Sequence, residues 1–423
     1  MKKTKDERLL DSLDYIDQKY IAGAEKYYKA TPDGRIAEKF ARRNRWLKVA
    51  VAIAACLVLL AVAVPTATIV IEHGEYTPPT VGAENSGVEL ELPPQYDGSR
   101  GLQYVVNEDG KTASFVGFGN CTDEDIVIAS YYEGLPVVEM RNQPYYDEDL
   151  HYNDFAYGNE YAKSLTISDT VKRVLGAIID ECPNLERVYI GASVEGFQAP
   201  DYGAAQPSKI VSIEVSPENK NYSGEGNCLV DLRDKRLVWG CNTSVIPDNG
   251  SIEEIGVVAF AFNPGFSATY LPEGIKIIHP LAFSGCNGLT TLRLPSTLET
   301  VYGSTFAWCE NLSSVDLNGL SEIPMSMFSL CKSLKEVKGS ENITHIGPDS
   351  FASCISLTIN LSTSLKKIDE IAFAFLYQNG EAVINFAGTM AEWNAIEKAE
   401  NWKSNSWLIT VNCTDGVLKF TGK

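Results

Sequence analysis

The chain has 423 residues, more than one ordinary domain holds, and 44% of them are apolar, which excludes a mainly disordered protein. Residues 1–48 hold 13 Lys and Arg against 8 Asp and Glu, and the remaining 375 hold 23 against 47, so their charges are +5 and −24. An acidic body argues against nucleic acid as a partner, because its phosphates would be repelled.

The first 48 residues predict a cytoplasmic segment that is amphipathic and basic. Apolar residues recur at steps of three and four, as on one face of a helix: Leu9, Leu10, Leu13, Ile16 and Tyr20. From Val49 to Ile71 there are 23 residues without a charged side chain, enough to cross a hydrocarbon core of about 30 Å. Basic residues precede this stretch and acidic residues follow it, so the positive-inside rule puts residues 1–48 in the cytoplasm and the rest outside.

A cleavable signal peptide is the competing interpretation of this stretch, since Ala61-Val62-Ala63 offers a small-x-small cleavage site. Its charged region would, however, span all of residues 1–48. We therefore favour an uncleaved, single-pass signal anchor over residues 49–71. Residues 72–100 are rich in Pro, Gly and Glu with little apolar periodicity, which predicts a stalk.

The cytoplasmic start also carries a resemblance. Leu13-Asp14-Tyr15-Ile16-Asp17 and Trp46-Leu47-Lys48 look like the start shared by many Firmicute single-pass membrane proteins, some of which are anti-sigma factors. The resemblance implies an alternative function, a membrane-tethered sensor or regulator with a cytoplasmic partner for residues 1–46.

Residues 101–160 predict an N-terminal β cap. Gly101–Val106 and Ala113–Phe118 alternate on either side of the turn Asn107–Gly110, which indicates a hairpin. A Tyr-rich and acidic stretch within 139–160 departs from this pattern and predicts a solvated insertion rather than a cation site.

One apolar pattern then recurs from residue 161 to residue 378. In its last six copies, a Phe returns every 22 or 23 residues, a β-branched residue precedes it by five, and in four copies a Cys follows it by three. The phenylalanines are Phe260, Phe283, Phe306, Phe328, Phe351 and Phe373. The copy around Ile179 and Cys182 is degenerate, and Cys228–Leu232 with Lys235–Trp239 predicts a hairpin inserted at about 211–245.

A period this short fits one strand plus a turn, and each unit alone would expose its apolar face, so the units must stack into a solenoid. Leu294-Pro295-Ser296-Thr297-Leu298, through Val301 to Phe306 and Cys309, resembles the BspA-type leucine-rich repeat of bacterial surface proteins. The resemblance implies a mainly β leucine-rich-repeat solenoid of about 22–23 residues per coil, with β caps. It also implies adhesion to host or matrix proteins or to other cells.

Residues 379–423 resemble the strand–helix–strand closing cap of such arrays. Met390 to Ala399 would form the helix, and Trp393 and Trp402 would cover the last coil.

The cysteines favour packing over cross-links. Cys182, Cys286, Cys309, Cys331 and Cys354 occupy one repeat position, where parallel Cα–Cβ vectors suit buried thiols better than disulfides. Only Cys228 and Cys241, which flank the hairpin, form a plausible pair. No paired zinc spacing or catalytic motif stands in a matching context, and His279 and His345 are expected to face solvent. We expect no enzyme activity, no cofactor and no metal.

The remaining expectation is a binding surface. Alternate residues of each repeat strand point inward, so their neighbours point out and line up from coil to coil on the expected concave face. The candidate ligand-binding residues are Arg187, Tyr189, Tyr270, Thr291, Arg293, Ser314, Asp316, Glu336, Lys338 and Thr358. We expect a non-enzymatic cell-surface adhesion protein that presents this face to an extracellular protein or glycan.

Overall fold

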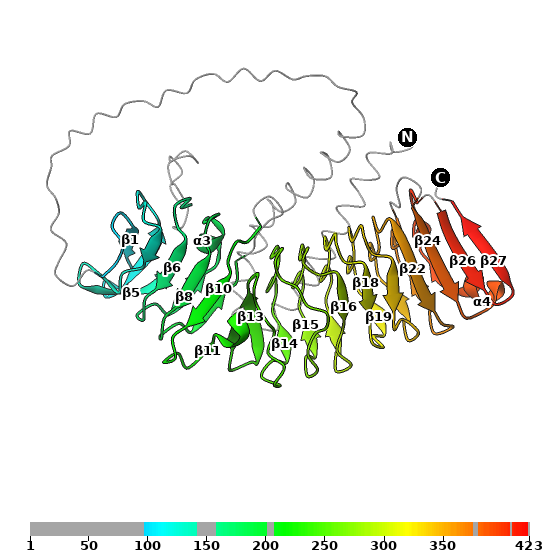
Figure 1. Ribbon diagram of the computed structural model, residues 1–423, viewed down its shortest axis with the longest axis horizontal. Helices are drawn as coiled ribbons and strands as arrows, with labels where there is room; N and C mark the ends of the chain where they lie inside the picture. Colours follow the sequence, from blue (N-terminus) through cyan, green and yellow to red (C-terminus); the bar gives the residue numbers. More distant parts are fainter. Residues whose placement is uncertain (1–96, 142–157, 201–206, 375–379, 407, 422–423) are drawn as a thin grey trace, which may run out of the picture. The chain divides into compact units, whose positions relative to one another are not determined.

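The computed structural model describes residues 97–141, 158–200, 207–374, 380–406 and 408–421, all within the compact unit Glu89–Lys423 (Figure 1). The segments predicted at 1–48 and 49–71, almost all of the stalk and most of the Tyr-rich insertion lie outside these residues. In the part of the chain that is described, no helix has the length and apolar character needed to cross a membrane. The anchor and the cytoplasmic partner therefore stay predictions.

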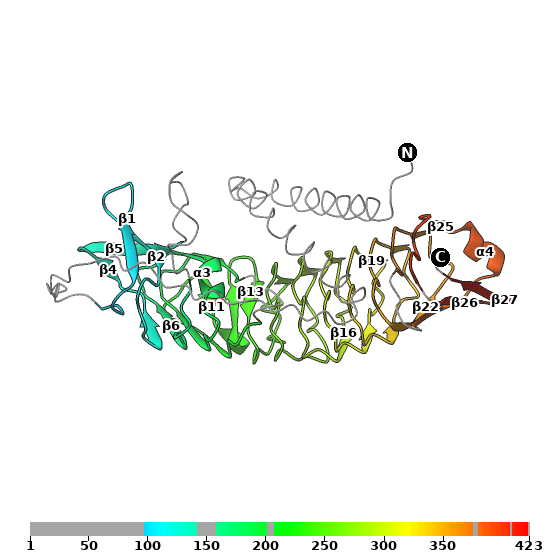
Figure 2. The ribbon, with the colours of Figure 1, turned by 90° about the horizontal axis from the view of Figure 1, so that it is seen from above.

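The described residues form a mainly β solenoid in which most coils contribute two short strands, visible from two sides in Figure 1 and Figure 2. We call the sheets of first strands the front sheets and the sheets of second strands the back sheets. The N-terminal front sheet is parallel and comprises β3 (Asp125–Val127), β6 (Ser164–Ile167), β8 (Arg187–Ile190) and β10 (Ser212–Val215). The C-terminal front sheet is parallel up to its last strand and comprises β16 (Thr291–Arg293), β18 (Ser314–Asp316), β20 (Glu336–Lys338), β22 (Ser356–Leu361), β24 (Glu381–Phe386), β26 (Leu408–Cys413) and β27 (Gly416–Phe420).

In the C-terminal half, the back sheets are built from two-residue strands whose β-branched residues point into the core. Ile255, Ile278 and Ile346 are each fully buried there, as the repeat pattern requires. The first back sheet holds β1 (Gln103–Val106), β2 (Ala113–Gly117), β4 (Tyr131–Tyr132), β5 (Leu135–Met140), β7 (Arg173–Leu175) and β9 (Gly196–Gln198). The others hold β14 (Glu254–Ile255), β15 (Ile277–Ile278), β17 (Thr300–Val301), β19 (Glu322–Ile323), β21 (His345–Ile346), β23 (Lys367–Ile368) and β25 (Glu397–Lys398).

An antiparallel hairpin joins the two halves of the solenoid. It consists of β12 (Cys228–Asp231) and β13 (Arg236–Gly240), preceded by β11 (Tyr222–Ser223) and the short 3-10 helix η1 (Glu225–Asn227). Since β10 pairs in parallel with β8, the solenoid continues past residue 211 and the hairpin begins later than expected. The register of the hairpin shifts between Leu229 and Val230, so that Leu229 pairs with Trp239 and Val230 pairs with Leu237. Leu229 and Trp239 pack into the N-terminal core, while Val230 and Leu237 pack into the C-terminal core.

The six repeat phenylalanines form one column, which confirms the stacking that their spacing predicts. Successive ring centroids lie 5.2–5.8 Å apart with interplanar angles of 7–24°, and all six side chains are fully buried. Trp402 closes the column edge-on, 5.9 Å from Phe373. Each ring thus covers the flank of the next, so a coil in the middle of the column leaves no aromatic face exposed.

The repeat cysteines stack beside this column as free, buried thiols. Each Sγ donates a hydrogen bond to the carbonyl oxygen of the column Phe one coil earlier. These bonds are Cys286 to Phe260 (3.0 Å), Cys309 to Phe283 (3.1 Å), Cys331 to Phe306 (3.1 Å) and Cys354 to Phe328 (3.2 Å). Cys228 and Cys241 are also free thiols, so the pair considered from the sequence is not a disulfide.

The two ends of the solenoid are closed differently. At the start, β1 and β2 form the antiparallel hairpin expected around Asn107–Gly110. At the end, α4 (Met390–Ala395) begins at a capping box between Thr389 and Glu392, and Trp393 and Trp402 are buried over the last coil as expected. The helix is shorter than predicted, because Ile396 is extended and the next two residues pair with β23 as β25.

Candidate functional site

The ten candidate residues all point outward on the front sheets, but they fall into two groups. Arg187 and Tyr189 lie on β8 of the N-terminal front sheet, and Tyr270 pairs with Arg293 beside β16 at the start of the C-terminal one. The others lie on β16, β18, β20 and β22, where they alternate with inward residues that are at most 3% exposed. Their role in binding stays a prediction.

Charges alternate in sign along one row of the C-terminal front sheet. Arg293, Asp316 and Lys338 are in register on three successive strands. Lys338 Nζ lies 3.2 Å from Glu336 Oε2 in the neighbouring row, and both side chains are about half exposed. Exposed pairs of this kind contribute about 0–1 kcal/mol to stability, so these charges are not needed to hold the fold.

The same row continues as a ladder of asparagines, which the sequence reasoning missed. Asn385 Nδ2 donates to Asn360 Oδ1 at 2.9 Å, and Asn412 Nδ2 donates to Asn385 Oδ1 at 2.8 Å. The register places Asn360 beside Lys338 across the sheet, since Glu336 pairs with Thr358. Extending the outward alternation two residues past Thr358 would have found Asn360. Asn385 and Asn412 are not among the candidates, because the sequence assigns residues 379–423 to the closing cap and not to the repeat strands.

The N-terminal front sheet holds a shallow hollow of about 420 Å³ around the other two candidates. Its polar lining comprises Arg187 and Tyr189 from β8, Ser164 and Thr166 from β6, and Glu214 from β10. The Arg187 guanidinium lies 3.5 Å from the Asp125 carboxylate on β3. Cation, phenol, hydroxyls and carboxylate therefore face solvent together on four adjacent strands.

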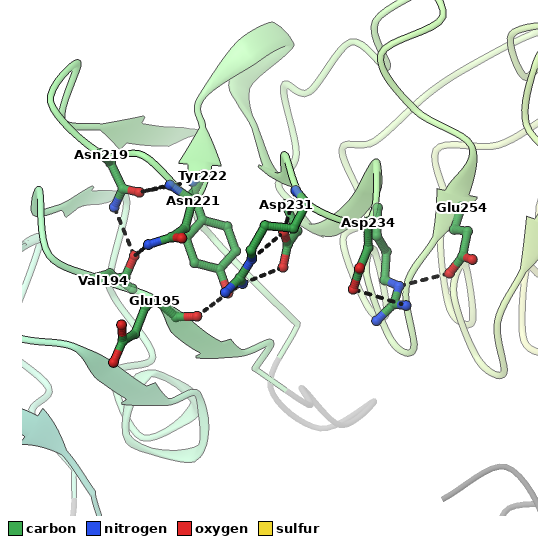
Figure 3. A network of polar contacts seen from close by, with 10 residues as sticks. Val194, Glu195, Asn219, Asn221, Tyr222, Asp231, Asp234 and Glu254 are labelled. Carbon is green, nitrogen blue, oxygen red and sulfur yellow. Dashed lines mark hydrogen bonds and ion pairs between the residues drawn. The ribbon is translucent and has the colours of Figure 1, made fainter. Parts of the chain in front are cut away.

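The joint between the halves carries a denser polar network (Figure 3). Arg233 donates to both carboxylate oxygens of Asp231, at 2.9 and 2.6 Å, and to Tyr222 Oη at 3.2 Å. Burial pushes the pKa of Asp231 up, but the hydrogen bonds from Arg233 outweigh it and hold that pKa below its ordinary value. Asn219 donates to the Val194 carbonyl and accepts from Tyr222 N–H. These groups are satisfied by one another, so the network stabilises the hairpin and offers little to a ligand.

The histidines of the described coils are tied to carboxylates of adjacent coils. Nε2 of His279 lies 3.0 Å from Glu254 Oε2, and Nε2 of His345 lies 2.7 Å from Asp369 Oδ2. The expectation that His279 faces solvent is wrong: it is 2% exposed and stacks on Tyr302. Burial lowers its pKa, although Glu254 opposes the shift. Within the described ranges, no group of three or more His, Cys, Asp or Glu could hold a metal ion.

The repeats themselves settle which kind of solenoid this is. Residues 253–378 match the BspA type Leucine rich repeat region in six copies, one for each ring of the Phe column. They are a BspA-type leucine-rich repeat region. No curated protein matches the chain.

The solved structures to which this chain is similar include three bacterial ones. A leucine-rich repeat protein from Eubacterium ventriosum is 18% identical with a TM-score of 0.41, over 66% of this chain and 87% of that one. A leucine rich cell surface protein from Faecalibacterium prausnitzii is 17% identical with a TM-score of 0.36, over 72% and 98%. The pneumococcal vaccine antigen PcpA is 14% identical with a TM-score of 0.41, over 76% and 99%.

In the BspA-type repeats, all of the charged candidates lie on the front strand and none lies at the corner that holds Phe and Cys. Core positions and outward positions are thus separated by strand alternation within each coil. The outward positions can vary without disturbing the column, which is the arrangement that a binding surface on a repeat scaffold needs.

Proposed function

We propose that this chain is a non-enzymatic, cell-surface binding protein whose C-terminal front sheet captures an extracellular protein or glycan. The carrying observation is the row Arg293, Asp316, Lys338 and Asn360, in which charged and amide groups stand in register on four neighbouring strands. The Arg293 guanidinium makes no hydrogen bond or close ion pair with any described residue, and only the Glu273 carboxylate attracts it from farther away, so it is available to a ligand.

The scaffold under this row supports the proposal. Strands in a parallel sheet are spaced by about 4.8 Å, so the row offers a fixed series of polar groups at that interval. Val315, Val337 and Ile359 anchor the strands from the inside, at 0–1% exposure. A rigid, prearranged set of groups loses little conformational entropy on binding, which favours affinity without any movement of the fold.

The test is charge reversal at two positions of the row. Arg293→Glu combined with Lys338→Glu should lower capture by the full-length chain, in detergent, of its strongest partners on glycan and extracellular-protein arrays by at least about tenfold. The melting temperature should stay unchanged, because exposed charges contribute at most about 1 kcal/mol to folding.

Lys366→Glu is the matched control, since Lys366 is also exposed but lies just before β23 on the back sheet. It should leave capture as it is in the unmodified chain. Equal capture by the double reversal and by this control would remove the front sheet as the binding surface.

A further inference from the structure

One junction between successive coils lacks the front-strand hydrogen bonds that its neighbours make. At regular junctions the Leu that precedes a Pro or an Asn bonds to the next coil: Leu271 N–H donates to the Arg293 carbonyl, Leu294 to Asp316 and Leu317 to Lys338, each at 2.9 Å. The equivalent residue one coil earlier is Ile246, which precedes Pro247 as Leu271 precedes Pro272. Its N–H bonds to no described residue, and neither does the N–H or the carbonyl of Tyr270 opposite it.

The coil at this junction also differs in length from its neighbours. Ile246 stands 14 residues before Phe260, whereas Leu271 and Leu294 stand 12 residues before Phe283 and Phe306. The extra length falls in the loop after Pro247. The strand segment around Val245 is instead tied back to the hairpin, because Val245 N–H donates to the Gly226 carbonyl at 2.9 Å. The row therefore opens between Ile246 and Tyr270.

A hollow of about 330 Å³ lies at this opening. The buried ring of Phe266 and the side chain of Ile246 line it, and Pro272 and Ala268 complete its apolar lining. At its rim, Val245 is 71% exposed, the highest value for a large apolar side chain on the described surface, and Tyr270 is 47% exposed. The carboxylate of Asp248 reaches the rim, with Oδ2 3.4 Å from Tyr270 Oη.

We propose that this gap binds an extended peptide that carries an apolar side chain next to a basic one. The peptide backbone would complete the interrupted row: its carbonyl accepts from Tyr270 N–H and its N–H donates to the Tyr270 carbonyl, as in β-strand addition. The apolar side chain fills the hollow, and the basic side chain pairs with Asp248. The inference rests on the proposed function, since it names the partner class for one end of the same binding surface.

A peptide fits these observations better than a glycan does. The unused groups are the backbone N–H and carbonyl of Tyr270, spaced as in a strand. The hollow beside them can receive a side chain of an added strand. A sugar would use the Tyr270 ring and the rim hydroxyls and would leave the N–H and the carbonyl without a strand partner.

The test uses the full-length chain in detergent and a probe peptide labelled at its N-terminus, fluorescein-KVLVK-amide, in which both lysines keep their charge. Binding is measured by fluorescence anisotropy, and amide hydrogen exchange is followed at Ile246 and Tyr270. The peptide should bind and slow exchange at Tyr270. Methylation of the peptide's backbone nitrogens should weaken binding by about tenfold or more, because the strand hydrogen bonds are lost.

Val245→Ser and Val417→Ser form a matched pair of variants, since both valines are largely exposed and only Val245 lines the hollow. Val245→Ser should weaken binding of the peptide through loss of the apolar rim, and Val417→Ser should not. Equal binding of the methylated and unmethylated peptides would overturn strand addition, and protection of Tyr270 by maltoheptaose but not by the peptide would favour a glycan.

The two proposals can fail separately. If the peptide does not bind while Arg293→Glu with Lys338→Glu still abolishes capture, the front-sheet function stands and the peptide site falls. If the peptide binds and the double reversal has no effect on capture, the charged row is not the binding surface and the peptide site beside Tyr270 is retained.

Discussion

The corner between a back strand and the next front strand is built differently in the two halves of the solenoid. In the N-terminal half it is the short helix α3 (Ala177–Asp180), whose amides bond within the coil, as Ile179 N–H does to the Gly176 carbonyl at 2.8 Å. In the C-terminal half, the column Phe donates to the following coil instead, as Phe283 N–H does to the Thr305 carbonyl at 2.9 Å. The C-terminal corner also keeps bonds within its coil, as Ser284 N–H makes to the Leu281 carbonyl at 3.1 Å, so the bond from the column Phe to the next coil is what distinguishes it.

The second arrangement imposes an unusual backbone. The residues two before and two after the column Phe have φ of +49° to +70°. They are Val258, Phe262, Leu281, Gly285, Ser304, Trp308, Ser326, Leu330, Asp349, Ser353 and Ile371. A left-handed conformation at a bulky residue costs about 1–3 kcal/mol and persists only where its surroundings fix it. Here the hydrogen bonds to the next coil fix it, so regular stacking determines a local conformation that the residues themselves disfavour.

The largest expected effect comes from breaking the column in its middle. Phe306→Ala removes ring contacts at 5.4 Å to Phe283 and 5.8 Å to Phe328 and leaves a cavity, so it should lower the free energy of unfolding by about 3–5 kcal/mol. Ile179→Ala, at the equivalent place in the N-terminal half, should cost less, near the lower end of about 2–5 kcal/mol, because no ring column depends on it. Urea denaturation measures both.

Trp308→Ala is the control for the Phe306 variant. Trp308 lies two residues away and is 36% exposed, so its loss should cost about 1 kcal/mol or less. If Ile179→Ala proves as costly as Phe306→Ala, the two halves do not differ in how strongly coils depend on each other.

How much of this could be predicted depends on whether a feature recurs. The column and the thiol stack follow from Phe and Cys returning in phase, and the hairpin follows from alternation around Arg233 and Asp234. The left-handed corners could not be predicted, since neither Gly nor Asn marks most of those positions. The burial of His279 and the opening beside Ile246 were equally hidden. Each occurs once, and a repeat pattern carries no information about single departures from it.

The second prediction concerns Asp349, a corner residue that has both a left-handed backbone and a buried carboxyl group. Asp349 has φ +57° and is half-buried, with its Oδ2 3.0 Å from Ser326 Oγ. Burial raises the pKa of Asp349 to about 6. The folded chain therefore holds an extra proton between about pH 4 and pH 6, so this group stabilises the fold less as the pH rises through that window. Above it, the buried charge is a full cost.

Asp349→Asn should therefore raise the free energy of unfolding at pH 7.5 by about 1–2 kcal/mol, because Asn carries no charge and tolerates the left-handed region. The gain should vanish near pH 4, where the carboxyl is protonated. Thermal unfolding of the two chains at pH 4, 5, 6 and 7.5 measures the difference between their free energies of unfolding. The pH dependence that comes from the other carboxylates is the same in both chains and cancels in this difference. A gain that is independent of pH would assign it to backbone conformation alone.

The smallest expected effect needs no substitution: the reactivity of the buried cysteines shows which half of the solenoid unfolds first. Burial raises the pKa of Cys182 and of Cys309 to about 12, and it raises that of Cys331 well above its ordinary value. A thiolate-directed reagent at pH 8 should therefore modify only the half-buried Cys413 among the described cysteines of the native chain. With rising urea, mass spectrometry of the labelled peptides should show Cys182 reacting before Cys309 and Cys331, because the N-terminal corner holds itself without support from a ring column. Simultaneous labelling of all three would mean that the hairpin, which packs into both cores, couples the halves into one cooperative unit.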